Sequence, residues 1–333
     1  MKRLFIIILS IILVSLAIPV FATSTGGTSA QFLKIPIGPR PESMGGAFTG
    51  LADDGSALFW NPAGTGQFEK AHMIAGYIGY VAKIKYEYFA AGFPIGDYYR
   101  LGIGLGALNS PPMLVTTFET LDIDGNIINN IYGTAGDEFN ASSNLFILNL
   151  SRKFRYGDRD LFYVGGNLKY VRESLADYKA FTLAYDLGIL FKVTESFRLG
   201  LSLQNLGGEL KFISEKEQLP QAFRFGLSYF FVNNELNRLV AASDIVKYID
   251  EDIKVGIGGE YTFRDLFVLR LGYNNADLGS MTAGLGVIIK FIKTRRVKGV
   301  VKRTEMVRVG INYAFVDYGD FGQTHRYSVG FRF

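Results

Sequence analysis

The chain has 333 residues, 28 phenylalanines, 19 tyrosines, 39 glycines, two histidines and no cysteine, which excludes disulfides and thiolate metal sites. Basic side chains outnumber acidic ones by only 35 to 31, a balance that argues against a nucleic-acid-binding surface. Only one long apolar run is present, at the N-terminus, whereas a helical membrane protein needs several runs of about 18–20 residues.

Residues 1–22 have the pattern of a cleavable signal peptide. Lys2 and Arg3 form its basic part, Leu4 to Ile18 form its apolar part, and Val20-Phe21-Ala22 supplies small residues at the positions read by signal peptidase. An uncleaved membrane anchor is the alternative, but the apolar run is short and polar residues follow it at once. No cysteine follows, so a lipoprotein is excluded.

Residues 23–70 do not fit a strand pattern, because prolines and glycines are clustered there. We expect a short helix from the Asp53-Asp54 pair to Trp60, ending at Asn61, because a residue that precedes a proline such as Pro62 avoids the helical region. This segment is too long to be a simple lead-in to the first strand.

From about residue 71 the dominant signal has a period of two. In residues 267–274, apolar side chains alternate with Val, Arg, Gly and Asn, and similar alternation runs through 197–204, 223–229 and 307–315. Side chains on a strand point alternately to opposite faces, so each strand has one apolar face and one face rich in small, polar or charged residues.

A soluble β-sandwich also alternates. The small residues on the polar face, the segment length of about ten residues and the aromatics near strand ends favour strands that cross a bilayer. A sheet in lipid must close, since unpaired edge groups are too costly there. The fold class is therefore all-β, a transmembrane antiparallel β-barrel of about 14 strands spanning residues 71–333. The predicted strands are residues 71–81, 84–94, 99–108, 139–153, 160–171, 178–192, 196–204, 219–231, 237–247, 251–263, 265–274, 278–291, 304–316 and 324–333.

The strand count also predicts the topology. An even number places both ends of the barrel on the periplasmic side, with the long connections 109–138 and 205–218 outside and short turns inside. The basic link 292–303 breaks this asymmetry, because the count places it inside. Either it is a long inner connection, or the two flanking strands extend beyond the membrane.

A barrel of this size needs something to fill its lumen, so we interpret residues 23–70 as an N-terminal plug, or hatch. Asp53 and Asp54 either cap the short helix or meet luminal arginines such as Arg224, Arg270 or Arg308. Trp60 either lines a pocket or packs in the core of the plug.

Several charged side chains fall at inward positions. Buried charges must be paired or hydrated, so they predict a wet or salt-bridged lumen. These residues either anchor the plug and stiffen the barrel or contact a ligand. The lumen-facing candidates are Arg198, Arg224, Lys254, Glu260, Arg270, Arg308 and Arg326.

The C-terminus places Tyr327, Phe331 and Phe333 on one face of the last strand. This pattern resembles the terminal signal read by the barrel assembly machinery of the outer membrane.

The stretch FLKIPIGPRPESMGGAFTGLADDGSALFWNPAG at 32–64 resembles the PorV/PorQ family of outer-membrane proteins, which is similar to the FadL long-chain fatty-acid transporter family. The segment NLGGELKF at 205–212 and the ending GQTHRYSVGFRF agree with it, while Arg40 departs from the usual run. The motif residues of the expected plug are Met44, Gly45, Gly46, Asp53, Asp54, Trp60, Asn61 and Pro62. The resemblance implies a fourteen-stranded barrel with an N-terminal hatch.

The resemblance implies a conduit for hydrophobic or small molecules across the outer membrane. The alternative is a PorV-like, non-enzymatic component of a protein secretion or surface attachment system. We expect outer-membrane lipid and the assembly machinery as partners, with a hydrophobic ligand or secretion proteins, no nucleic acid and no cofactor. We expect no enzyme and no catalytic or metal site, since His72 and His325 begin antiparallel neighbouring strands and therefore lie at opposite ends.

Overall fold

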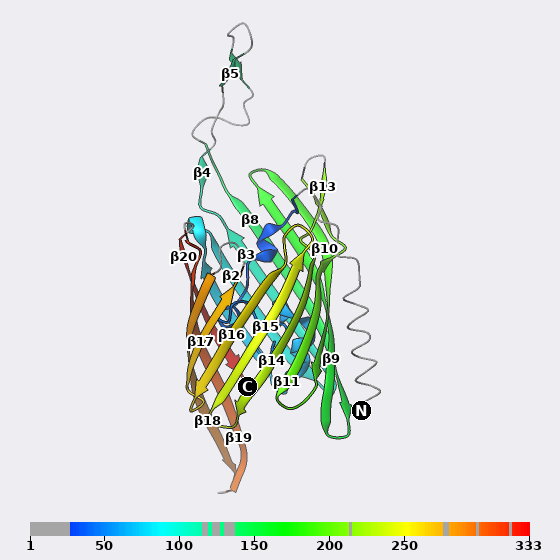
Figure 1. Ribbon diagram of the computed structural model, residues 1–333, viewed down its shortest axis with the longest axis vertical. Helices are drawn as coiled ribbons and strands as arrows, with labels where there is room; N and C mark the ends of the chain where they lie inside the picture. The colour runs from blue at the N-terminus through cyan, green and yellow to red at the C-terminus, as the bar shows by residue number, and fades with distance from the viewer. Residues whose placement is uncertain are drawn as a thin grey trace.

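The computed structural model describes residues 27–114, 119–121, 127–129, 137–212, 215–275, 280–297, 300–319 and 322–333, so the expected signal peptide lies outside the described residues. The described strands form a closed antiparallel barrel of fourteen strands (Figure 1). The barrel strands are β1 (His72–Gly79), β2 (Lys85–Ile95), β3 (Tyr99–Asn109), β8 (Ala141–Tyr156), β9 (Arg159–Leu175), β10 (Tyr178–Lys192), β11 (Phe197–Leu206), β14 (Ala222–Asn233), β15 (Arg238–Tyr248), β16 (Lys254–Phe263), β17 (Phe267–Asn274), β18 (Ser280–Val297), β19 (Val300–Asp317) and β20 (Gln323–Arg332).

The barrel closes where β1 pairs with β20, from His72 opposite Arg332 to Gly79 opposite His325. Closure leaves no unpaired edge along the barrel wall, the condition that a sheet in lipid must meet. The fourteen predicted strands all correspond to barrel strands, so the predicted fold class is confirmed. The small strands β4 (Met113–Leu114), β5 (Glu119–Leu121), β6 (Ile127–Asn129), β7 (Glu138–Phe139), β12 (Glu209–Lys211) and β13 (Lys216–Gln218) form three two-stranded sheets in the connections.

The outer surface of the barrel is apolar because the side chains alternate. On β3, Leu101, Ile103 and Leu105 are exposed on the outside, whereas Gly102 and Gly104 are buried on the inside. The same alternation runs along β8 and β10. A barrel whose outward face is apolar and whose lumen carries polar groups suits a bilayer.

The two ends of the barrel differ in their connections. The long connections 110–140 and 207–221 lie at one end, called here the loop end. The short turns, such as 96–98 and 157–158, lie at the other, called the turn end. This is the asymmetry that the sequence predicted.

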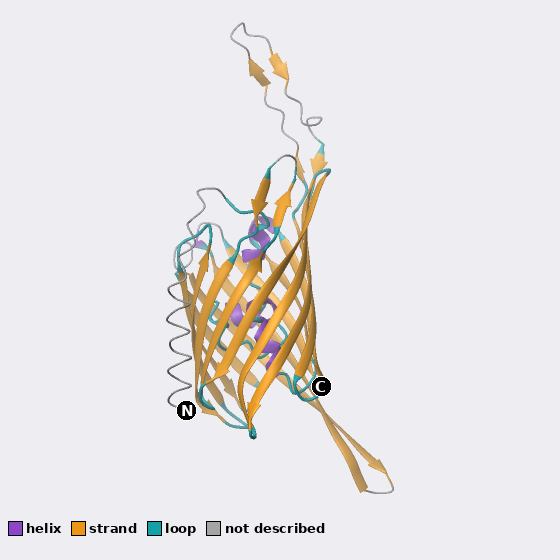
Figure 2. Cartoon of the chain, turned by 90° about the vertical axis from the view of Figure 1, so that its right-hand side faces the viewer, coloured by secondary structure: helices purple, strands orange, loops and turns teal. Residues whose placement is uncertain are grey.

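The β18–β19 hairpin extends beyond the barrel at the turn end (Figure 2). The two strands pair with each other as far as Val297 opposite Val300, although β17 pairs with β18 only to Val287. The basic link 292–303 is therefore mostly paired strand, so extension of the strands is confirmed and a long inner connection is wrong.

Residues 27–70 lie inside the barrel, where Figure 2 shows their short helices. They form η1 (Gln31–Lys34), α2 (Pro39–Glu42), α3 (Ala57–Trp60) and η2 (Pro62–Gln67). The chain enters at the loop end, where the Ser29 amide donates to the Gln218 carbonyl at 3.0 Å, and reaches β1 at the turn end. No helix of the described residues is long and apolar enough to cross a membrane.

This luminal segment, residues 27–70, fits the wall through glycines. A Cβ on Gly258 or Gly272 of the wall would collide with the backbone of Met44, and one on Gly200 would collide with Thr49. On the opposite wall, a Cβ on Gly165 would collide with the backbone of Pro62. The inward glycines that mark an enclosed lumen in the sequence therefore have a specific cause, because they let one backbone rest directly on another.

Candidate functional site

Two cavities border the luminal segment, one toward each end of the barrel. The loop-end cavity has a volume of about 500 Å³, and the turn-end cavity one of about 450 Å³. Both fall within the size range of small-molecule sites. Gly45, Gly46 and Trp60 of the segment line the first, whereas Asp53 and Gly55 line the second.

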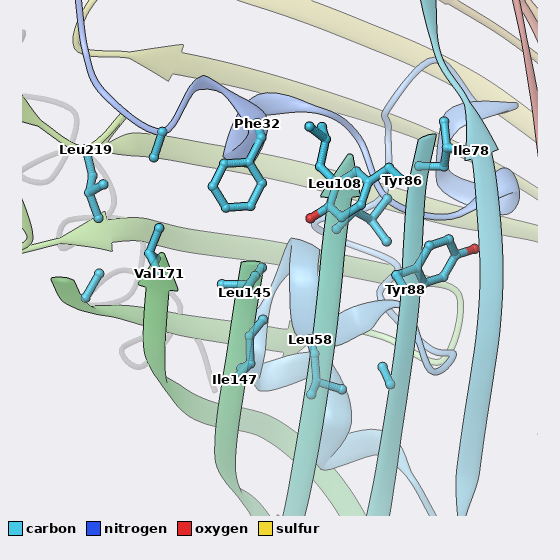
Figure 3. Packing of buried hydrophobic residues seen from close by; sticks show 14 of the residues in the cluster. Phe32, Leu58, Ile78, Tyr86, Tyr88, Leu108, Leu145, Ile147, Val171 and Leu219 are labelled. Carbon is cyan, nitrogen blue, oxygen red and sulfur yellow. The ribbon is translucent and has the colours of Figure 1, made fainter. Parts of the chain in front are cut away.

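The loop-end cavity has a largely apolar lining. Its apolar residues come from the segment and from several strands and connections: Phe32, Ile35, Trp60, Ile84, Leu108 and Val246. Behind them lies a continuous buried cluster, in which Phe32 makes an edge contact with Tyr86 at 6.2 Å between ring centroids. Figure 3 shows Phe32 facing the strands that carry Leu108 and Leu145. This half of the lumen offers a small hydrophobic molecule a surface to contact.

Trp60 belongs to both of the alternatives that the sequence left open. It is buried in a second apolar cluster, meets Phe48 edge-on at 6.1 Å, and donates from Nε1 to the Ile37 carbonyl at 2.8 Å. The Arg224 guanidinium lies 5.0 Å from its ring centroid, and the indole also lines the loop-end cavity. Trp60 therefore packs in the segment core and forms part of a cavity wall.

Asn61 and Pro62 attach the segment to the opposite wall. The short helix α3 ends at Trp60, and the next residue, Asn61, has an extended backbone (φ −150°, ψ 109°), as predicted for a residue before proline. The Asn61 side chain donates to the Ile189 carbonyl at 3.2 Å, and Asn149 donates to the Pro62 carbonyl at 3.1 Å. This wall contact fixes the middle of the luminal segment.

At the loop end, the first residues of the segment are tied to the β15–β16 connection. Lys34 forms ion pairs with Asp250 at 2.7 Å and Glu251 at 2.9 Å, and the Thr28 hydroxyl donates to Asp250 at 2.6 Å. Burial raises the pKa of Asp250, but hydrogen bonds from Lys34, Thr28 and Gln31 outweigh it and lower that pKa to about 2. This group of contacts, the loop-end anchor, displaces the start of β16 from the predicted residue 251 to Lys254.

Toward the turn end, the segment meets the wall through a layer of ion pairs centred on Arg40. Its Nε and Nη2 donate to the two oxygens of Glu260 at 2.6 and 2.9 Å. Its Nη1 donates to Asp53 at 2.7 Å and to Asp54 at 2.9 Å. Such bidentate contacts are among the strong, geometrically specific hydrogen bonds in proteins.

The wall completes this charged layer. Arg270 donates from Nε to Glu260 at 2.6 Å, Arg238 lies 2.9 Å from Asp53, and Arg198 lies 3.9 Å from the same carboxylate. Between the loop-end cavity and the turn end, the lumen therefore contains a compact cluster of charges shared by the segment and the wall. The side chains of this layer offer a neutral hydrophobic molecule charged groups and not an apolar surface.

The expected partners of Asp53 and Asp54 were partly wrong. Neither forms an ion pair with Arg224, Arg270 or Arg308 among the described residues. Arg224 donates to Gln204 at 2.9 Å and to Tyr248 at 2.7 Å in the loop-end half, Arg270 is bound to Glu260, and Arg308 lies 3.1 Å from Asp265. These arginines occupy different depths of the barrel, which alternation along a strand does not reveal.

Of the two interpretations of the aspartates, contact with luminal arginines is correct and the helix cap is wrong. The residue before α3 is Ser56, and no side chain caps the helix there. Asp54 accepts from the Ser56 backbone amide at 2.9 Å, which lies before the helix. Asp53 instead accepts from wall arginines. The helix begins at Ala57, after the aspartates.

Two other lumen-facing candidates are also paired. Arg326 lies 3.2 Å from Glu42 of the segment and donates to the Pro36 carbonyl, and Lys254 lies 2.7 Å from Glu251. The sequence reasoning missed Arg40 and Arg238. Arg238 stands in the inward row of β15, and Arg40 is the position at which the sequence departs from the family pattern.

The predicted assembly residues Tyr327, Phe331 and Phe333 are exposed on the outside of the barrel. Phe333 and Ala71 exchange both backbone hydrogen bonds, at 3.0 and 3.1 Å, so the last residue takes part in barrel closure. His72 stacks on Phe68 and His325 lies near Tyr313, at opposite ends of the β1–β20 pair.

The sequence matches no protein-family model and no curated protein. The fold is similar to those of the toluene transporter TbuX of Ralstonia pickettii (TM-score 0.53, 15% identity) and the toluene transporter TodX of Pseudomonas putida (0.53, 14%). It is also similar to a FadL homologue of Pseudomonas aeruginosa (0.51, 11%). Coverage is 89, 88 and 90% of this chain and 97, 96 and 98% of those chains, respectively. The likeness therefore covers about nine-tenths of this chain, and it is a likeness of fold.

Proposed function

We propose that this chain is an outer-membrane conduit for small hydrophobic molecules. In this proposal the chain reaches the outer membrane after cleavage of its signal peptide. The observation that carries the proposal is the loop-end cavity of about 500 Å³, with a lining that is mainly but not wholly apolar, inside a closed barrel with an apolar exterior. The fold likeness to two toluene transporters and a FadL homologue supports it. In this orientation the loop end faces the outside and the turn end faces the periplasm.

The luminal segment has the role of a plug in this proposal. Its backbone lies against wall glycines, and Arg40 and Asp53 bind wall residues of opposite charge. Water-soluble solutes would have to pass the charged layer and the packed segment, whereas a hydrophobic molecule is held in the loop-end cavity by apolar contacts. The conduit is therefore selective for apolar molecules and admits few ions.

The test uses a pair of substitutions in the connection 80–84 between β1 and β2, which contains η3 (Val81–Lys83). Ile84 lines the loop-end cavity, so Ile84→Asn places an amide among its apolar residues. Ala82 is exposed and has a φ of +54°, a conformation that asparagine tolerates, so Ala82→Asn is the matched control.

Toluene uptake into cells expressing each variant at equal levels is the measurement. We expect Ile84→Asn to lower uptake about tenfold, the effect of a polar group that costs about 1–2 kcal/mol of ligand contact. Ala82→Asn should match the unmodified protein. Equal uptake by all three proteins and by cells that lack the barrel would contradict the proposal, and loss of surface-protein export on deletion of the chain would favour a secretion role instead.

A further inference from the structure

The turn-end cavity has a different composition from the loop-end cavity. Seven of its lining residues are arginine or lysine and five are aspartate or glutamate, whereas three basic and four acidic residues line the loop-end cavity. Of these two cavities, the turn-end one has the excess of positive charge. The hydrophobic conduit proposed above does not account for this excess.

The strand register places two of these basic residues in one row with a third that lies outside the lining. Lys290 of β18, which does not line the cavity, lies opposite Arg308 of β19, and Arg308 lies opposite Arg332 of β20. Like charges directly opposite each other destabilise a sheet unless an anion lies near them. Asp265 partly compensates for two of them, at 2.6 Å from Lys290 and 3.1 Å from Arg308. Within the described part of the chain, Arg332 forms no ion pair.

Across the cavity, two arginines of the charged layer are partly exposed. The side chains of Arg198 and Arg238 are 13% and 28% exposed, and both line the cavity. The layer as a whole has four arginines and three carboxylates: Arg40, Arg198, Arg238 and Arg270 against Asp53, Asp54 and Glu260. The layer therefore carries one positive charge more than its carboxylates balance.

We propose that the turn-end cavity binds a small oxyanion, a carboxylate or a phosphate, through Arg198, Arg238 and Arg332. An oxyanion supplies the negative charge that the basic lining lacks, and its oxygens accept hydrogen bonds from guanidinium groups. Ile74, Val268 and Ile288 also line the cavity, so an organic anion with a small apolar body fits it. The proposal concerns the periplasmic mouth and does not depend on passage of hydrophobic molecules.

Equilibrium binding to the folded, detergent-solubilised full chain tests this proposal. Benzoate is the probe, benzamide is its uncharged counterpart of the same shape, and inorganic phosphate is titrated in parallel to identify the preferred oxyanion. Calorimetry is done at low ionic strength, because salt screens such contacts. We expect the affinity for benzoate to exceed that for benzamide by about tenfold or more, since hydrogen bonds between charged groups are stronger than those to a neutral amide.

Two variants locate the site. Arg332→Gln and Arg198→Gln should each lower benzoate affinity about tenfold, while Arg159→Gln, an exposed arginine at the same end outside the cavity, should leave it unchanged. Heat-modifiable mobility verifies folding, and if Arg332→Gln in the last strand fails to assemble, Arg198→Gln carries the test.

Equal binding of benzoate and benzamide, with phosphate not bound, would overturn the proposal. So would unchanged benzoate affinity in Arg198→Gln. Because the measurement contains no transport step, a failure here leaves the toluene experiment unaffected, and the reverse also holds.

Discussion

Glu260 is the wall residue on which the charged layer most depends. It is 3% exposed, accepts two hydrogen bonds from Arg40 and one from Arg270, and lies 3.6 Å from Arg238. The substitution Glu260→Gln preserves the size of the side chain and removes its charge. The amide keeps one acceptor oxygen where the carboxylate had two, so Arg40 and Arg270 must share it. Arg40 still has its aspartates, whereas Arg270 loses the negative charge it is paired with.

Removing one partner of a buried ion pair costs about 3–5 kcal/mol, because the remaining charge is left uncompensated. We therefore expect Glu260→Gln to lower the free energy of unfolding by about this amount in urea titrations of the folded barrel. Since Arg40 belongs to the luminal segment, part of the loss should appear as weaker attachment of that segment. Ion conductance in planar bilayers and protease cleavage within residues 40–60 should both rise.

Glu195→Gln is the matched control, because Glu195 is exposed in the β10–β11 turn at the same end. A surface substitution of this kind changes stability by less than about 0.5 kcal/mol. If Glu260→Gln unfolds at the same urea concentration as Glu195→Gln and conducts no more current, the charged layer does not hold the segment and the reasoning fails.

Gly258→Val should displace Met44, because even a Cβ at position 258 collides with the Met44 backbone. We expect the variant to lose about 1–3 kcal/mol of unfolding free energy in urea titration and to conduct more ions. Unchanged stability and conductance would show that the segment does not rest on the wall. The lowered pKa of Asp250 means that its ionised form stabilises the fold. Its contact with Lys34 should therefore persist above about pH 4 and weaken as the pH falls through about 2. Hydrogen exchange in residues 29–35 should become faster over this pH range in the unmodified protein but not in Asp250→Asn. The same pH dependence in the two proteins would contradict the prediction. Deleting Phe333 should slow assembly and lower the yield of heat-modifiable barrel, whereas unchanged folding kinetics would make its strand an ordinary one.

The barrel was predictable from sequence because strand alternation is a local property. The predicted strand 178–192 has the same bounds as β10, since a single row of alternating side chains determines both. Errors arise where a contact with a distant residue determines the bounds of a strand. The start of β16 moved from residue 251 to Lys254 because Asp250 and Glu251 bind the luminal segment.

The charged layer was harder to predict from the sequence, because distant contacts determine it too. Alternation predicts that Glu260 and Arg270 face inward, but it does not indicate their depth or which partner reaches them. Arg40 and Glu260 are 220 positions apart, and their contact depends on the path of the luminal segment through the barrel. The sequence predicts that residues 23–70 are irregular, and it contains no local signal that the chain enters at the loop end and leaves at the turn end.

The central claim is that the barrel passes hydrophobic molecules while the luminal segment excludes ions. Toluene flux and ion conductance, measured together on proteoliposomes of the intact chain and of a chain lacking residues 27–70, test it most directly. The account predicts toluene flux with low conductance for the intact chain and a large rise in conductance on deletion. An intact chain that conducts ions like an open pore, or one that passes no toluene, would contradict it.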